Sequence, residues 1–321
     1  IKCNCSMEES IVENEQNLMA EGKRRGPGLV LRGICMGTAD VIPGVSGGTV
    51  ALIMGIYDEL VGTIASIDQR VVGALVRGRI AEVLRLTNAP FLIPLFFGIG
   101  LAIVSLAKLI TWLLATHPQP VWGLFTGLIL ASALFVARQV KGWSVPQWGL
   151  TVVGVAVGYL VTTLVPVETG TESYKFVLAG MVAICAMILP GISGSFLLVV
   201  MGKYQQVFGA VHEREFGIIA LFGVGAIIGL LGFSRLLKRL LARFHAETMA
   251  FLVGLMLGSL RKVWPFRNVL EEKLIGSKVR VLRDECVWPQ EYSGEVLLSF
   301  VLMVVGAVLI LALERLGREK S

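Results

Sequence analysis

Two copies of a short Pro-Gly-x-Ser-Gly phrase contain the residues of this chain that are best suited to chemistry. The copies begin at Pro43 and Pro190, and each lies inside a long apolar run where proline and glycine interrupt a helix. A helix that restarts after such a break presents free backbone N–H groups, which together with a serine hydroxyl suit a phosphate or carboxylate. We therefore predict anion binding by Pro43, Gly44, Ser46, Gly47, Gly48 and Thr49 in the first copy, and by Pro190, Gly191, Ser193, Gly194 and Ser195 in the second. The simpler alternative is a kinked helix in which each serine only caps the break.

Three charged residues in or beside apolar segments are further candidates. Asp40 precedes Pro43 by three positions, and its counterpart in the second copy is Met187. A membrane carboxylate without a repeat partner is a candidate coupling site for a proton or cation, and the alternative is a cap that bonds to the backbone of the hairpin. Arg32 and Lys108 are candidate contacts for an anionic head group. Their alternatives are an interfacial anchor for Arg32 and a snorkelling side chain for Lys108.

The elements that must position these residues are membrane-spanning helices. The chain has 321 residues, of which 55% are apolar and 16% charged, and its mean hydropathy is +0.76, which excludes an ordinary soluble domain. Several apolar runs approach or exceed the ~20 residues that a helix needs to cross a bilayer. Six crossings are predicted, at Phe91–Leu114, Pro120–Ala137, Pro146–Val167, Phe216–Ser234, Thr248–Leu260 and Val296–Leu313. We therefore expect an all-α polytopic membrane protein.

The segments around the two copies form an internal repeat. With an offset of 147, residues 33–60 and 180–207 share nine of 28 residues, and weaker matches continue at offsets of 125, 127 and 152. Paired Gly/Pro-interrupted segments in two halves are typical of transporter binding sites. If the first run crossed the membrane, the Arg-rich stretch after it would lie outside, against the positive-inside rule. Both runs are therefore predicted to be re-entrant hairpins, at 30–62 and 176–207. One hairpin and three spans in each half make two inverted repeats, with both termini in the cytoplasm.

The predicted domain boundaries follow this repeat. Residues 1–28 are polar and are expected to be disordered, the first repeat covers 29–167, and the second covers 168–315. An amphipathic stretch over 67–88 is expected to be a helix in the inner membrane interface, with an ordinary linker helix as the alternative. Residues 261–292 are expected to be a loop insertion. Its Arg261, Lys262 and Arg267 would lie outside the membrane, in conflict with the charge rule.

Other classes of function are disfavoured. A net charge of +6 could suit nucleic acid, but Lys and Arg lie mostly between hydrophobic runs, where membrane topology explains them. The Gly-x-Ser-Gly-Gly stretch at 44–48 is superficially like a hydrolase nucleophile motif, yet His117, His212 and His245 all fall near membrane edges or loops. The sequence contains no known metal or cofactor motif. We expect no cofactor, no metal, no nucleic-acid partner and no enzymatic activity, and the oligomeric state stays open.

The two motifs also resemble a known family. Residues 33–49 read Gly-Ile-Cys-Met-Gly-Thr-Ala-Asp-Val-Ile-Pro-Gly-Val-Ser-Gly-Gly-Thr, and residues 190–195 read Pro-Gly-Ile-Ser-Gly-Ser. Together they closely resemble the bacterial polyprenyl-phosphate translocase family called PopT, over about residues 28–315. The resemblance implies a transporter in the bacterial cytoplasmic membrane that returns undecaprenyl phosphate, the lipid carrier of peptidoglycan and other envelope glycans, from the outer to the inner leaflet.

Two other functions stay open beside this one. The same helix breaks, facing each other near the membrane midplane, would serve a transporter of a small soluble anion, with or without proton coupling. A membrane hydrolase of lipid phosphates that uses a hairpin serine is the third reading.

Overall fold

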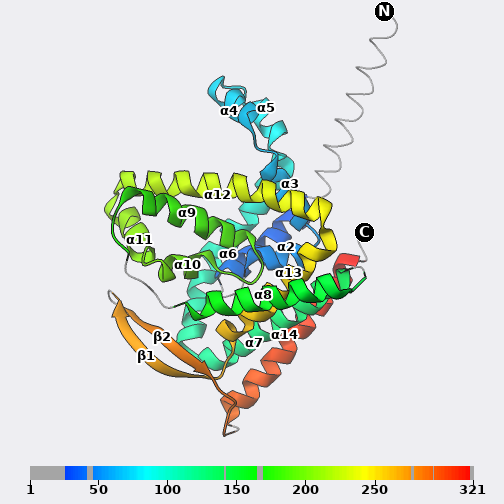
Figure 1. The fold of residues 1–321 in the computed structure, drawn as a ribbon, viewed down its shortest axis with the longest axis vertical. Helices are drawn as coiled ribbons and strands as arrows, with labels where there is room; N and C mark the ends of the chain where they lie inside the picture. The colour runs from blue at the N-terminus through cyan, green and yellow to red at the C-terminus, as the bar shows by residue number, and fades with distance from the viewer. Residues whose placement is uncertain are drawn as a thin grey trace, which may run out of the picture.

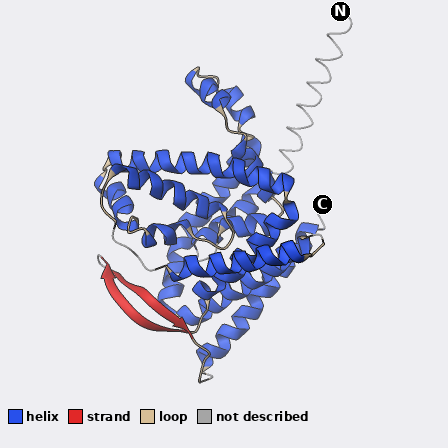
Figure 2. Ribbon diagram, in the orientation of Figure 1, coloured by secondary structure: helices blue, strands red, loops and turns tan. Residues whose placement is uncertain are grey.

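The computed structural model describes residues 26–41, 46–140, 142–164, 169–275, 278–291 and 293–318. Of the predicted polar segment 1–28, all but the last three residues lie outside this part of the chain, and so do Pro43 and Gly44. The described chain is mostly helical and carries a two-stranded hairpin (Figures 1 and 2).

The helices follow one another with mostly short connections. The first half contains a helix over 26–41, α2 (Gly47–Ile53), α3 (Tyr57–Ala65), α4 (Gln69–Val76), α5 (Ile80–Leu86), α6 (Ala89–Thr116), α7 (Pro118–Gln139) and α8 (Val145–Thr163). The second half contains α9 (Ser173–Ile188), α10 (Gly194–Val200), α11 (Tyr204–Glu213), α12 (Phe216–Arg243), α13 (His245–Val263), β1 (Arg267–Ile275), β2 (Lys278–Cys286) and α14 (Gly294–Arg318). In Figure 1, α9 and α12 lie side by side, α8 and α14 lie below them, and α4 and α5 project from the body.

Five of the described helices are long and apolar enough to cross a membrane, namely α6, α7, α8, α12 and α14. They coincide with five of the six predicted crossings. The sixth, Thr248–Leu260, lies in α13, whose 19 residues include Glu247, Arg261 and Lys262 and therefore leave no full-length apolar window. Most of α13 is buried against α7 and α8, so protein rather than lipid covers it.

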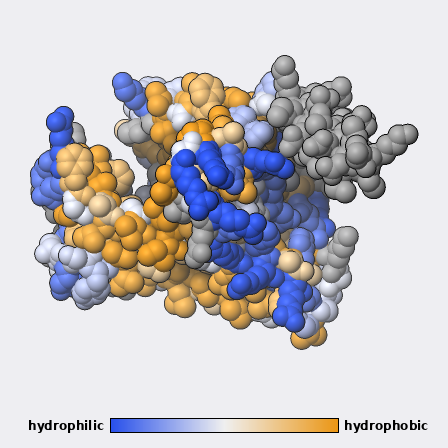
Figure 3. All heavy atoms as spheres, turned by 90° about the horizontal axis from the view of Figure 1, so that it is seen from above, coloured by the Kyte–Doolittle hydropathy of each residue, from blue (hydrophilic) through white to orange (hydrophobic). Residues whose placement is uncertain are grey.

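The surrounding helices turn apolar side chains outward. Exposed examples are Val104 on α6, Val152 on α8, Ile227 on α12 and Val304 on α14. Figure 3 shows apolar residues spread widely over one face, with hydrophilic residues gathered near its middle. Such an exposed apolar surface would be a liability in water and is what lipid requires.

Glycines bring the helices into backbone contact. A Cβ added at Gly127 of α7 would overlap the carbonyl of Met303 on α14, and one added at Gly254 of α13 would overlap the carbonyl of Thr151 on α8. The Thr151 hydroxyl also donates a hydrogen bond to the Ala250 carbonyl, with 3.1 Å between the oxygens. Small residues at crossings are the usual way to pack helices in lipid, where apolar burial alone gives no drive.

The same contacts recur in the two halves. A Cβ at Gly33 would overlap the Leu95 carbonyl, and one at Gly180, 147 positions later, would overlap the Phe222 carbonyl, 127 positions after Leu95. This offset of 127 replaces the 125 inferred from the sequence, which aligned α6 and α12 two residues out of register.

The later helices match at the predicted offsets. Gly127 and Gly254 are 127 apart, and the carbonyls that they approach, those of Met303 and Thr151, are 152 apart. Each such contact joins a helix of one half to a helix of the other, α7 to α14 and α8 to α13. Helices that precede residue 168 are therefore packed directly against helices that follow it.

Two inserted segments differ from expectation. The predicted loop at 261–292 contains an antiparallel hairpin of β1 and β2, so the fold is not entirely α. The predicted single helix over 67–88 is two helices, because Gly78 has a φ of +68° and ends the first one in a left-handed turn.

A matched pair of glycine substitutions on α8 tests the packing argument. In Gly154→Ala the new methyl group would overlap the Phe251 carbonyl of α13, and we expect a loss of about 1–3 kcal/mol of stability from overpacking. Gly149 faces open space, so Gly149→Ala should leave stability unchanged or raise it by about 1 kcal/mol through helix propensity. Thermal unfolding of the purified variants in detergent measures both, and equal midpoints would contradict the argument.

Candidate functional site

The described residues on the two sides of the first break, between the helix over 26–41 and α2, are hydrogen-bonded to each other. The Asp40 carboxylate accepts a hydrogen bond from the Gly47 N–H at 2.7 Å, and the Ser46 hydroxyl accepts one from the Gly48 N–H at 3.2 Å. The capping alternative for Asp40 is thus the one that the geometry matches. A phosphate at this point would have to displace a carboxylate, and coupling by Asp40 stays a prediction.

The two motifs are brought into contact although they lie more than 140 residues apart. The buried Ser46 hydroxyl donates to the Met187 carbonyl at 3.1 Å, and the Tyr57 hydroxyl donates to the Ile188 carbonyl at 3.2 Å. A Cβ at Gly48 would lie 2.6 Å from the same Ile188 carbonyl oxygen. The first turn of α2, including the buried Gly47 and Thr49, therefore packs on the end of α9.

The second break, between α9 and α10, lies wholly within the described residues and carries an exposed serine. Ser193 caps α10, its hydroxyl lies 2.9 Å from that of Ser195, and Ser195 is exposed. Pro190, Gly191 and Gly194 are buried. Gly191 has a φ of +84°, and a Cβ there would lie 2.9 Å from Met256 Cα and 3.0 Å from the Ser259 hydroxyl, so the chain turns directly against α13.

The asymmetry between the breaks comes from the pair Asp40 and Met187. A Cβ at Gly47 would lie 2.7 Å from an Asp40 oxygen, and a Cβ at Gly194 would lie 2.7 Å from Met187 Cγ. The two side chains thus occupy equivalent places, one with a charge and one without. Because α2 and α10 each have only seven residues, hydroxyls and side-chain charges matter more here than a macrodipole.

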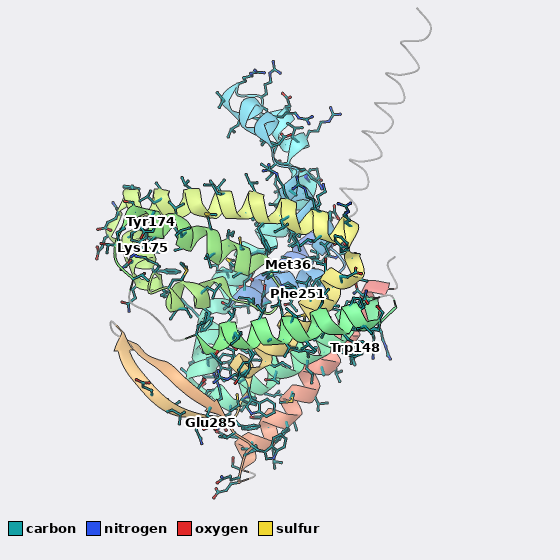
Figure 4. The ribbon with its side chains drawn as sticks, viewed as in Figure 1. Met36, Trp148, Tyr174, Lys175, Phe251 and Glu285 are labelled. Carbon is teal, nitrogen blue, oxygen red and sulfur yellow. The ribbon has the colours of Figure 1, made fainter. Side chains whose placement is uncertain are left out.

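The two cations predicted to contact the head group, Arg32 and Lys108, are not bonded to the described residues of either break. Arg32 is half-buried on the helix over 26–41, and Lys108 is exposed on α6. Neither makes a hydrogen bond or ion pair to the two breaks within the described ranges. Figure 4 labels Met36, of the helix over 26–41, and Phe251, of α13, near the middle of the molecule.

A cation that the sequence analysis did not assign to the site does lie at the second break. Lys262 Nζ is 4.8 Å from the ring centroid of Phe196, which follows Ser195. In the sequence, Lys262 stood out only because its charge conflicted with the predicted topology. Among the described residues, no group of three or more His, Cys, Asp or Glu side chains is arranged to hold a metal ion.

The amino-acid sequence matches a known family. The undecaprenyl phosphate translocase-like family matches residues 36–278, most of the chain and both breaks. The chain belongs to this family. Among its relatives, a polyprenyl-phosphate transporter of Vibrio cholerae serotype O1 is 42% identical over 247 residues, or 75% of this chain and 80% of the relative. A polyprenyl-phosphate transporter of Staphylococcus aureus is 31% identical over 193 residues, or 54% of this chain and 68% of the relative. No solved structure matches. Membership of the undecaprenyl phosphate translocase-like family confirms the resemblance seen in the two motifs.

Substitutions at Asp40 test its capping role. Asp40→Ala leaves the Gly47 N–H without its acceptor and should lower stability by about 1 kcal/mol, whereas Asp40→Asn keeps an oxygen acceptor and should lose less. Asp58 is an exposed carboxylate on α3, so Asp58→Ala is the control and should stay within about 0.5 kcal/mol. Thermal unfolding measures all three, and a loss that is no larger for Asp40→Ala than for Asp58→Ala would contradict the role.

Proposed function

We propose that this protein transports undecaprenyl phosphate across the bacterial cytoplasmic membrane, returning the lipid carrier from the outer to the inner leaflet. The observation that carries the proposal is the family match over 36–278, which includes both helix breaks. The names of the two relatives, both polyprenyl-phosphate transporters, support the same substrate class. On this reading the protein moves a lipid and does not convert it chemically.

The physical difficulty of this transport is the head group. A phosphate cannot enter hydrocarbon unaided, because burying an ion costs several kcal/mol even after relaxation. Irregular backbone at membrane depth is tolerated where protein buries it or a watery cavity receives it. Two breaks that touch each other inside an apolar body therefore offer polar groups to the head group, while the prenyl tail stays in lipid.

The architecture that we propose is an inverted repeat. The matched glycine contacts at offsets of 147, 127 and 152 support two equivalent halves. The bend of 119° between α2 and α3 is compatible with a re-entrant first hairpin and also with a broken span, and the charge pattern of the sequence favours the hairpin. With both termini in the cytoplasm, rocking of one half against the other would open the breaks to each leaflet in turn.

The projecting α4 and α5 expose Leu75, Val76 and Ile80 beside Arg77 and Arg79. In this topology they would rest on the anionic inner surface of the membrane.

Within the site, we assign the phosphate first to the second break. Ser193 and Ser195 offer hydroxyls there, while the first break is capped by Asp40. Ser46 and the glycines of the first motif would also contact the phosphate when Asp40 releases the Gly47 N–H, for example on protonation.

This assignment makes Asp40 a site of proton coupling. Transport by Asp40→Asn should then lose its dependence on pH, and an unchanged dependence would remove the coupling idea.

Binding and transport by the purified protein test the function. We expect reconstituted protein to bind undecaprenyl phosphate tightly, to move it between leaflets of proteoliposomes, and to release no dephosphorylated product. Ser193→Ala and Ser195→Ala should weaken binding about tenfold, if each hydroxyl donates to a charged phosphate. Ser105→Ala, on the exposed side of α6, is the control and should bind normally.

The other readings give different results in the same assays. Inorganic phosphate that competes as strongly as the lipid would indicate a transporter of soluble anions. Appearance of undecaprenol, lost in Ser46→Ala or Ser193→Ala, would indicate a hydrolase with a serine nucleophile.

A further inference from the structure

The last turn of α13 forms one wall of the second break. Gly191 turns against Met256 and Ser259, and Lys262, three residues after Ser259, places its ammonium 4.8 Å from the Phe196 ring centroid. Residues three apart on a helix share a face. Lys262 and Ser259 therefore look toward the same segment, 191–196, from one side of α13.

The charges around Lys262 do not balance. Arg261 and Arg267 both pair with Asp284 of β2, with N–O distances of 3.4 and 3.0 Å, and the Asp284 side chain is only 10% exposed. Lys262 is half-buried, and no ion pair joins it to Asp284 or to another carboxylate whose side chain the structure describes. Three cations thus share one carboxylate, and the two arginines already use it.

Aromatic rings hold the two arginines in place. The Arg261 guanidinium carbon lies 5.7 Å from the Tyr159 ring centroid, and that of Arg267 lies 5.0 Å from the Trp122 centroid. Arg261 also donates a hydrogen bond to the Asp284 carbonyl at 2.7 Å. The β1–β2 hairpin, on which Figure 4 labels the neighbouring Glu285, therefore pairs Asp284 with Arg261 and Arg267, while Lys262 is influenced by that carboxylate without an ion pair to it.

A partly desolvated ammonium that shares its nearest counter-charge with two arginines is costly, and an anion that binds beside it offsets that cost. The Ser193 and Ser195 hydroxyls, 2.9 Å apart, lie on the segment that Lys262 faces. Hydroxyl donors next to a lysine ammonium suit a phosphate monoester. The Phe196 ring beside them is an apolar surface suited to the first part of a prenyl chain.

We propose that Lys262 is the cation that binds the phosphate of the transported lipid at the second break, with Ser195 as the hydroxyl donor beside it. This rests on the proposed function, and it adds a substrate contact that the two motifs do not contain. It also gives the β1–β2 hairpin a role, which is to hold the competing carboxylate of Asp284 on the two arginines.

Paired binding measurements on the full-length protein in detergent test the proposal. Lys262→Gln removes the charge and should weaken undecaprenyl phosphate binding about tenfold or more, since hydrogen bonds to charged groups are the strong ones. Binding of undecaprenol, which lacks the phosphate, should not change. Lys262→Arg keeps a cation and should retain most of the affinity. Lys238→Gln, an exposed cation on α12, is the matched control and should bind as wild type does.

The outcomes separate the two proposals. Wild-type protein that binds no undecaprenyl phosphate would overturn the proposed function itself. Wild-type protein that binds the lipid while Lys262→Gln binds it equally well would overturn only the role of Lys262. Equal loss of undecaprenol and undecaprenyl phosphate binding in Lys262→Gln would show a structural role and overturn the proposal as well. Inorganic phosphate added as a competitor distinguishes a free anion from the lipid head group, and weak competition is the expected result.

Discussion

Backbone contact between helices at glycine is the constraint on which the rest of this structure depends. Apolar side chains gain little from meeting one another in lipid, so the halves are held by close approach at residues such as Gly127 and Gly254. The contact of Gly254 with Thr151 holds α13 against α8, and α7 also packs on α13. Because α13 in turn supports Gly191 and carries Lys262, the shape of the second break depends on helix crossings that touch no substrate.

Each break in the apolar segments must also satisfy its own backbone groups, because no water is available in hydrocarbon. The two breaks do this in different ways. At the first, the described residues use a carboxylate, a serine hydroxyl and the carbonyls at the end of α9. The second uses a glycine with positive φ and a pair of serine hydroxyls, and it leaves Ser195 exposed. Similar sequences thus satisfy their backbone groups with different side chains.

The sequence was sufficient for the features that repeat and for those set by hydropathy. Five apolar helices and the family were predictable, because each depends on long runs or on short phrases that can be read directly. The β1–β2 hairpin was not, since charged residues such as Glu271, Glu272 and Lys273 interrupt the alternation expected of a strand. Lys262 was missed for another reason. The role proposed for it depends on the pairing of Asp284 with Arg261 and Arg267, which lie 23 and 17 residues before Asp284, and no local pattern reveals such a pairing.

The mismatch of Asp40 and Met187 bears on the balance between the two states of the proposed transporter. If two inverted halves were identical, an exchange of their conformations would convert the outward-facing protein into the inward-facing one, and in a symmetric bilayer the two states would have equal energy. The halves differ at the Asp40–Met187 pair beside Gly47 and Gly194, at α4 and α5, and at the β1–β2 hairpin, and each difference removes that equality. Such differences set the state in which the empty protein rests, whereas a gradient or a coupled ion sets the net direction of lipid movement.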